Sequence, residues 1–140
     1  MNKLLAMPCK RVGADINGNI YSKETLEKAI EEFNSPKRHR RNLGGLGSNT
    51  DGYINPERSS HLVDNMRFDA TGEIVLVDIQ VLSTPMGRLL ENGYRVDSGR
   101  FGMSCVGGID KDKNVELHRI VSVDFIEGET WEEVYGEKCK

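Results

Sequence analysis

The sequence predicts an α+β protein in which a mostly antiparallel sheet or barrel carries two or three flanking helices. Residues 60–82 and 99–126 alternate between apolar and polar side chains, as strands do, whereas residues 23–33 repeat apolar side chains at helical spacing. The 15 glycines gather mainly in residues 44–52 and 87–108, where turns and close backbone contacts are expected. At 140 residues, the chain is expected to form one domain, residues 1–140.

The first expected helix follows a tight turn at Asn17-Gly18, and Ser22 occupies the position of its N-cap. Its apolar stripe consists of Leu26, Ala29, Ile30 and Phe33. The stripe predicts an amphipathic helix that ends at residues 34–36.

Two β-hairpins are expected to supply the sheet. Residues 61–68 and 73–82 flank a turn, and the second strand is apolar at nearly every position, which predicts a central strand with both faces covered. Residues 99–109 and 115–126 form the second hairpin. One face of its second strand is expected to hold Val115, Leu117, Arg119, Val121, Val123 and Phe125.

Two shorter helices follow the hairpins. Thr84-Pro85 provides an N-cap and a first-turn proline, and Gly93 can end that helix. Thr130 and Glu133 have the spacing of a capping box, which predicts a last helical turn with Trp131, Val134 and Tyr135 against the sheet.

Composition excludes several classes of protein. The net charge is −3 and the pI about 5.6, so no global attraction to nucleic acid or anionic membranes is expected. No apolar run approaches the ~20 residues of a membrane helix, which favours a soluble protein. Residues 1–9 have too short an apolar part for a signal peptide, and we expect a strand or arm there.

The cysteines indicate neither a metal site nor a disulfide framework. Cys9, Cys105 and Cys139 form an odd set without a CxxC pair, so we expect a reducing compartment and no bound metal.

Residues 37–41 form a basic segment whose charges come from Lys37, Arg38, Arg40 and Arg41. The glycines that follow lack the GxxxxGK[ST] order of a phosphate-binding loop. Two interpretations stay open, a solvated loop and a docking site for an acidic partner. Nucleic-acid binding through the three arginines is a third hypothesis, for which four charges would give a shallow salt dependence.

Six short motifs follow one another between residues 17 and 125: residues 17–29, the Leu-Gly-Gly-Leu-Gly-Ser of residues 43–48, the Ser-His of residues 60–61, residues 82–87, the Gly-Met-Ser-Cys-Val-Gly of residues 102–107, and residues 123–125. In this order they resemble the motifs of the prohead maturation proteases of tailed phages. These are serine proteases whose fold is related to the herpesvirus capsid-assembly protease. The resemblance implies that fold, no cofactor, and capsid or scaffold proteins as partners.

The catalytic positions depart from the family pattern. The resemblance places the nucleophile at Ser104, but the family's histidine falls at Ser48. The glutamate three residues earlier is replaced by Gly45, and the arginine after the nucleophile by Val106. A serine hydroxyl needs an adjacent base to attack near neutral pH, and loss of the base typically reduces turnover about 10⁴ to 10⁶-fold.

Three other residues bear on this interpretation. His61 is interpreted as a structural histidine, with a role as substitute base kept as the alternative, and His118 as a solvated residue. Asp124 could orient a base; without one, we expect it to hydrogen-bond the backbone or Ser104. Cys105 points to the opposite face of its strand from Ser104, so the two cannot share a site.

The sequence therefore predicts a catalytically degenerate member of this family, a structural or assembly protein that binds capsid or scaffold protein without cleaving it. The alternative is an active maturation serine endopeptidase that uses Ser104, His61 and Asp124. Either protein would be found in the virion or the capsid precursor, assembled in the host cytoplasm. Oligomerisation is left open, and neither a membrane nor nucleic acid is expected as a partner.

Overall fold

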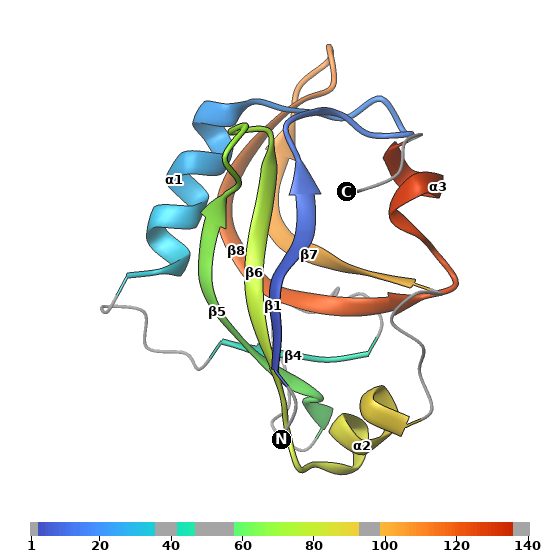
Figure 1. Cartoon of the computed structure of the whole chain (residues 1–140). Coiled ribbons are helices and arrows are strands. Elements are labelled where there is room, and N and C mark those ends of the chain that lie inside the picture. The colour runs from blue at the N-terminus through green and yellow to red at the C-terminus, as the bar shows by residue number, and fades with distance from the viewer. Residues whose placement is uncertain (1–2, 36–41, 47–57, 93–98, 136–140) are drawn as a thin grey trace.

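The computed structural model describes residues 3–35, 42–46, 58–92 and 99–135, which form two four-stranded sheets and three helices (Figure 1). The first sheet has the order β1-β6-β5-β4, with bounds Lys3–Arg11, Ile74–Val81, His61–Phe68 and Leu43–Gly44. The second has the order β2-β3-β8-β7, with bounds Gly13–Ala14, Ile20–Tyr21, Asn114–Glu127 and Gly99–Ile109. All neighbouring strands are antiparallel except β3 and β8, so the expected α+β fold with a mostly antiparallel sheet is confirmed.

Helix α1 (Lys23–Phe33) forms as its sequence predicts. The Ser22 hydroxyl accepts a hydrogen bond from the amide of Thr25 at 3.2 Å, and the whole predicted stripe is buried. At the other end, the Asn34 side chain bonds the backbone of Met66 on β5 in both directions, at 2.7 and 3.2 Å. The helix is thereby fixed to the first sheet.

The caps of the two shorter helices also form. The Thr84 hydroxyl accepts from the Gly87 amide at 3.0 Å at the start of α2 (Pro85–Asn92). Thr130 and Glu133 bond each other's amides with their side chains before α3 (Trp131–Tyr135). Trp131, Val134 and Tyr135 are buried, as expected.

Strand β6 lies between β1 and β5, which confirms its central position. The expectation that both of its faces are covered is wrong. Its residues alternate between half-buried and fully buried, with Val75, Val77, Ile79 and Val81 in the core. Asp78 and Gln80 lie on the other face, because the core occupies only one side of this sheet.

Strand β8 contains two bulges, which correct the single apolar face expected for it. Ser104 of β7 pairs with Ser122, but Cys105 pairs with Ile120, so Val121 is an extra residue on β8. Val106 pairs with Arg119 and Gly107 with Leu117, so His118 is a second extra residue. Between the two bulges the side-chain alternation is shifted, and Ile120, expected on the other face, is fully buried. After the bulge at Val121, residues 122–125 are all buried.

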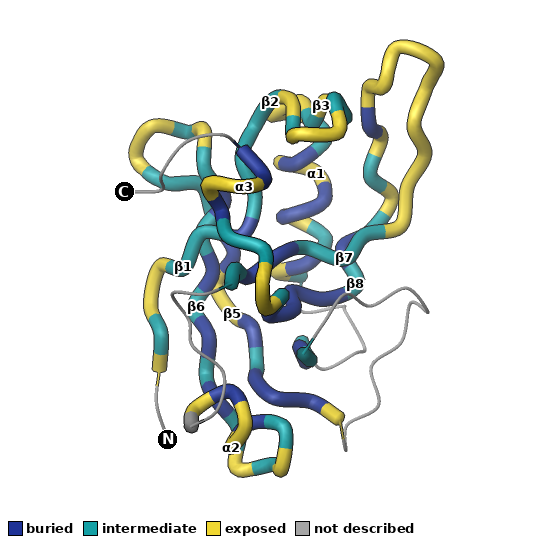
Figure 2. Tube along the Cα trace, turned by 90° about the vertical axis from the view of Figure 1, so that its right-hand side faces the viewer, coloured by how far each residue is buried: buried dark blue, intermediate teal, exposed yellow. Residues whose placement is uncertain are grey.

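One large core cluster joins the two sheets and α1. Phe101 of β7 packs edge-on against both His61 of β5 and Phe125 of β8, with ring centroids 5.3 Å apart in each pair. Figure 2 shows the buried residues concentrated in the body, while the β7–β8 hairpin extends from it with an exposed tip. Among the described residues, no helix is long and apolar enough to cross a membrane.

Candidate functional site

Ser104 and Asp124 lie next to each other on the paired strands β7 and β8. The Ser104 hydroxyl donates to Oδ2 of Asp124 at 2.6 Å, and the Ser122 hydroxyl donates to the same oxygen at 2.8 Å. Asp124 is only 1% exposed, so these donors replace the water that a buried carboxylate would otherwise need. Ser104 itself is half-buried.

The segment after β4 meets this site from the first sheet. The Gly45 amide donates to Oδ1 of Asp124 at 2.9 Å, and the Gly45 carbonyl accepts from the Phe125 amide at 3.0 Å. Leu46 then forms a bridge with Phe125. Asp124 therefore joins three segments of the chain, and Gly45, one of the positions that depart from the family, is in direct contact with the candidate site.

Gly45 leaves room for a side chain. A Cβ atom built on it would lie 3.7 Å from the Arg58 carbonyl oxygen and 3.9 Å from Oδ1 of Asp124, both ordinary contact distances. Packing alone therefore does not require glycine here.

His61 lies in the core, and both of its ring nitrogens have partners. Nε2 lies 2.7 Å from the carbonyl oxygen of Val123, and Nδ1 lies 2.7 Å from the hydroxyl of Ser60. Because a carbonyl oxygen only accepts, Nε2 carries the proton, and Nδ1 accepts from the Ser60 hydroxyl. The ring therefore links β5 to β8.

Burial lowers the pKa of His61, while the Val123 carbonyl and the charge of Asp124 act in the opposite direction. The side chain has 0% exposure, so the neutral imidazole is the form that fits this environment.

Gly44 makes room for this imidazole. A Cβ atom at this position would collide with Nε2 of His61 and with the carbonyl oxygen of Val123. The glycine therefore allows the close approach of β4 to the histidine.

The residues around Ser104 do not offer a thiol nucleophile. Cys105 packs against the core cluster, and burial raises its pKa to about 11. Val106 is 42% exposed, and His118 is an exposed residue four positions from Ser122 on β8.

Several predicted site residues lie outside the described residues. They are Lys37, Arg38, Arg40, Arg41 and Ser48. Within the described ranges, no group of three or more His, Cys, Asp or Glu side chains could hold a metal ion.

Sequence analysis missed two hydroxyls that shape the site, Ser60 and Ser122. The sequence was sufficient to place Ser122 beside Asp124, because it lies two residues before Asp124 and alternate residues of a strand share a face. Ser60 precedes the strand that contains His61, and its contact with the ring depends on the fold of that end of β5.

The two curved sheets and their flanking helices form a fold that is similar to that of a capsid assembly protease. The chain is similar to the bacteriophage T4 capsid assembly protease, gp21, with a TM-score of 0.69 over 91% of this chain and 92% of that one, at 15% sequence identity. This likeness confirms the expected fold. No family model matches the chain, and no curated protein matches its sequence.

Proposed function

We propose that this protein is a phage capsid-assembly protein that uses a protease fold to bind capsid or scaffold protein without cleaving it. The environment of His61 is the observation that carries the proposal. Both ring nitrogens are engaged within the core, by Ser60 and Val123, so this histidine has no nitrogen to offer the Ser104 hydroxyl. Position 48, where the resembled family has its histidine, is a serine.

The contact between Ser104 and Asp124 supports the same conclusion. In a serine protease the hydroxyl donates to a histidine, which takes the proton during attack, and the carboxylate orients that histidine. Here the hydroxyl donates to the carboxylate directly. The carboxylate then takes a structural role, together with the Gly45 amide and the Ser122 hydroxyl.

The second sheet offers a way to bind an extended chain. Strand β7, which contains Ser104, is the end strand of that sheet among the described residues. A sheet edge can pair with an extended segment through main-chain hydrogen bonds, and this interaction needs no catalytic base. Capsid or scaffold segments are the partners we infer, by analogy with the capsid assembly protease of similar fold.

Labelling with a fluorophosphonate probe tests the loss of catalysis. We expect the wild type and Ser104→Ala to be labelled equally weakly, and the co-expressed capsid and scaffold proteins of the same phage to bind both variants uncleaved. Labelling of the wild type that Ser104→Ala abolishes, with cleavage of the head proteins, would contradict the proposal.

An active maturation protease is the second candidate, and the position of the His61 ring beside Val123, the residue before Asp124, favours it. His61 would have to leave its two partners to act as the base. Labelling that disappears in both Ser104→Ala and His61→Gln, with both variants folded, would establish this alternative.

The proposal also places the protein in the capsid precursor or the virion. Mass spectrometry of purified proheads and mature particles, with copy numbers, tests this location. Absence from both particles would contradict an assembly role that requires stable incorporation.

A further inference from the structure

The outer end of β7, residues 106–109, is an open sheet edge. Strand β7 pairs with β8 on one side, and no strand of the described residues pairs with it on the other. All four residues are exposed, and the side chains of Val106 and Ile109 are 42% and 58% exposed. Figure 2 shows that they belong to the hairpin that extends from the body of the molecule.

The hydrogen bonds of this hairpin indicate which main-chain groups point outward. The Asp110 amide donates to the Asn114 carbonyl at 3.0 Å, so these two residues form a hydrogen-bonded pair. Opposite residues of two antiparallel strands alternate between hydrogen-bonded and non-hydrogen-bonded pairs. Gly108 therefore bonds to β8, whereas Gly107 and Ile109 do not.

A contact of β8 agrees with this alternation. Leu117, which is opposite Gly107, donates its amide to the hydroxyl of Thr25 on α1 at 3.0 Å and not to β7. The amide and carbonyl groups of Gly107 and Ile109 thus face the open edge, two residues apart. This is the spacing at which another strand forms hydrogen bonds.

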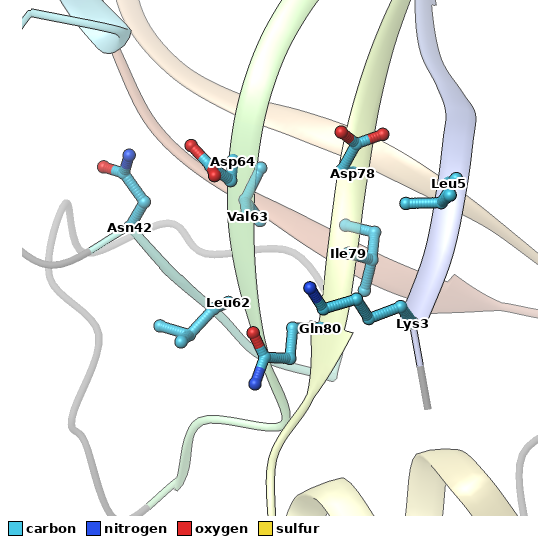
Figure 3. A pocket seen from close by; sticks show the side chains of 9 residues that line it. All are labelled: Lys3, Leu5, Asn42, Leu62, Val63, Asp64, Asp78, Ile79 and Gln80. Atoms are coloured by element: carbon cyan, nitrogen blue, oxygen red, sulfur yellow. The ribbon is translucent and has the colours of Figure 1, made fainter. Parts of the chain in front are cut away.

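The end strand of the first sheet, β1, has features that prevent strand pairing. Figure 3 shows Lys3 and Leu5 on this strand beside β6. The register of β1 shifts twice, Ala6 has a φ of 52°, and Pro8 has no amide to donate. Edge strands use lysines, prolines and bulges to avoid pairing with other chains. Residues 106–109 contain no charge and no proline, and the extra residues of the bulges lie on β8.

Gly108 lies at the centre of this open edge, and the hairpin itself does not require glycine there. A Cβ atom at this position has no neighbour within 4 Å, and its φ is not positive. At Gly107, by contrast, a Cβ atom would collide with the carbonyl oxygen of Glu116, so packing explains that glycine. A glycine inside a strand weakens it and often marks the close approach of another backbone.

We propose that residues 106–109 pair antiparallel with the same residues of a second copy of the chain. Gly108 lies on the two-fold axis, opposite Gly108 of the second copy. Gly107 pairs with Ile109 of the second copy, and Ile109 with its Gly107, and each pair exchanges both main-chain hydrogen bonds. The second sheets of the two copies then form one continuous sheet.

Four properties of the edge favour a second copy as the occupant. The two outward-facing residues lie symmetrically about Gly108, so identical edges satisfy each other's donors and acceptors. Residues 106–109 are uncharged, and the turn at 110–113 has two aspartates and two lysines, so no net charge gathers at the axis. Ile109 of each copy covers Gly107 of the other, which removes apolar surface from water. Because the hairpin extends from the body, antiparallel pairing places the two bodies at opposite ends (Figure 2).

The inference goes beyond the proposed function. Pairing of two copies needs neither catalysis nor a head protein, and the experiments below use the full chain alone. Each can therefore fail without the other.

Sedimentation velocity from about 10 μM to about 1 mM protein tests the pairing, because a short contact gives a weak dimer. We expect a monomer–dimer equilibrium that stops at the dimer. The amide NMR signals that shift with concentration should be those of residues 105–111. A chain that stays monomeric throughout would leave a segment of another protein as the occupant and overturn the proposal, as would larger aggregates or shifts confined to other residues.

Two lysine substitutions locate the contact. Ile109→Lys should weaken the dimer about tenfold, because like charges in neighbouring cross-strand positions are destabilising. Leu5→Lys makes the same kind of change on β1, at a residue that is 67% exposed, and should leave the association unchanged. Thermal unfolding verifies that both variants are folded. Equal association of the two would overturn the proposal.

Cysteine substitutions test the register. In Gly108→Cys the two thiols belong to a pair without hydrogen bonds across the axis, whose Cα atoms lie about 4.5 Å apart and can be joined by a disulfide. In Val106→Cys the two thiols lie about 13 Å apart, beyond that reach. In a glutathione redox buffer we expect a covalent dimer of Gly108→Cys and, for Val106→Cys, no more than the wild type forms. Equal amounts from the two variants would overturn the pairing about Gly108.

Discussion

At the scale of single residues, Asp124 is the centre of the candidate site. Its carboxylate accepts hydrogen bonds from Gly45, Ser104 and Ser122, which belong to three different segments. The contact that the sequence led us to expect between Asp124 and Ser104 is present. The Gly45 amide, which follows β4 of the first sheet, indicates that this aspartate helps to hold the two sheets together whether or not the serine reacts.

The first prediction concerns Ser104→Ala. The change removes one of the three donors to Asp124, so we expect a loss of about 1 kcal/mol in the free energy of unfolding. Urea denaturation measures this value. Phage that carry the change should assemble and process their heads normally, and an accumulation of uncleaved head proteins would instead identify an enzyme.

The second prediction concerns Asp124→Ala, which leaves the Gly45 amide and two hydroxyls without their shared acceptor. We expect a loss on the order of 3 kcal/mol, because the lost hydrogen bonds have a charged acceptor and the site is buried. Urea denaturation beside Ser104→Ala checks the order of the two effects. If Asp124→Ala lowered the free energy of unfolding no more than Ser104→Ala does, the contacts of Asp124 with Gly45 and Ser122 would not contribute measurably to stability.

The third prediction is a dependence of stability on pH that originates at His61. Burial lowers its pKa in the folded protein below the ordinary value of 6.5, so the unfolded chain takes up the proton first as the pH falls. Its contribution to stability is complete above pH 6.5 and is lost as the pH falls from there through the folded pKa. The urea midpoint should decrease over this window.

His61→Gln is the control for that pH dependence. It removes the titrating group, so its midpoint should change less between pH 7 and pH 5 than that of the wild type. An identical pH dependence in both proteins would show that other groups are responsible.

At the scale of elements, the short strand β4 connects the two sheets. It pairs with β5, and the residues that follow it contact β8 at Asp124 and Phe125. This connection between the sheets lies against His61. Because Gly44 has no side chain, β4 can approach the His61 ring closely at this point.

The fourth prediction follows from that close approach. Gly44→Ala places a methyl group against the His61 ring and a backbone oxygen of β8, and we expect a loss of about 3 kcal/mol. Gly108→Ala is the matched control, because a Cβ atom there has no neighbour within 4 Å. Thermal unfolding should show a large decrease for the first variant and little change for the second. Similar values would contradict the packing of β4 against His61.

At the scale of the whole molecule, we expect partner binding to involve more than one segment of the chain. The edge strand β7 and the basic segment at residues 37–41 are separate in sequence and differ in chemistry.

The fifth prediction concerns the basic segment, as the sequence defines it. Reversing the charges of Arg38 and Arg40 to glutamate should reduce incorporation into particles if the segment docks on an acidic partner. Incorporation of the wild type should then decrease with added salt, because exposed charges act over about 8 to 10 Å at physiological ionic strength. Quantitative mass spectrometry of particles measures both effects, and unchanged incorporation at every salt concentration would leave the segment as a solvated loop.

The sequence by itself determined the local elements of this protein. Ser22, Thr84 and Thr130 are caps whose partners lie three residues away, and both long hairpins were predicted from the alternation of their residues. These features depend on neighbours along the chain, so a single sequence contains the information that specifies them. The similarity of short motifs also predicted the fold that the structural comparison confirms.

Only the tertiary structure decided which faces are covered and what each polar group of the site contacts. The open face of β6, the bulges of β8 and the contact of His61 with Val123 depend on pairings between residues far apart in the chain. The composition of a strand does not determine which of its faces packs against the core. One extra residue in a strand reverses which side chains face the core beyond it. The role of a buried histidine or aspartate is set by the few atoms that surround it, and folding brings those atoms together from different segments.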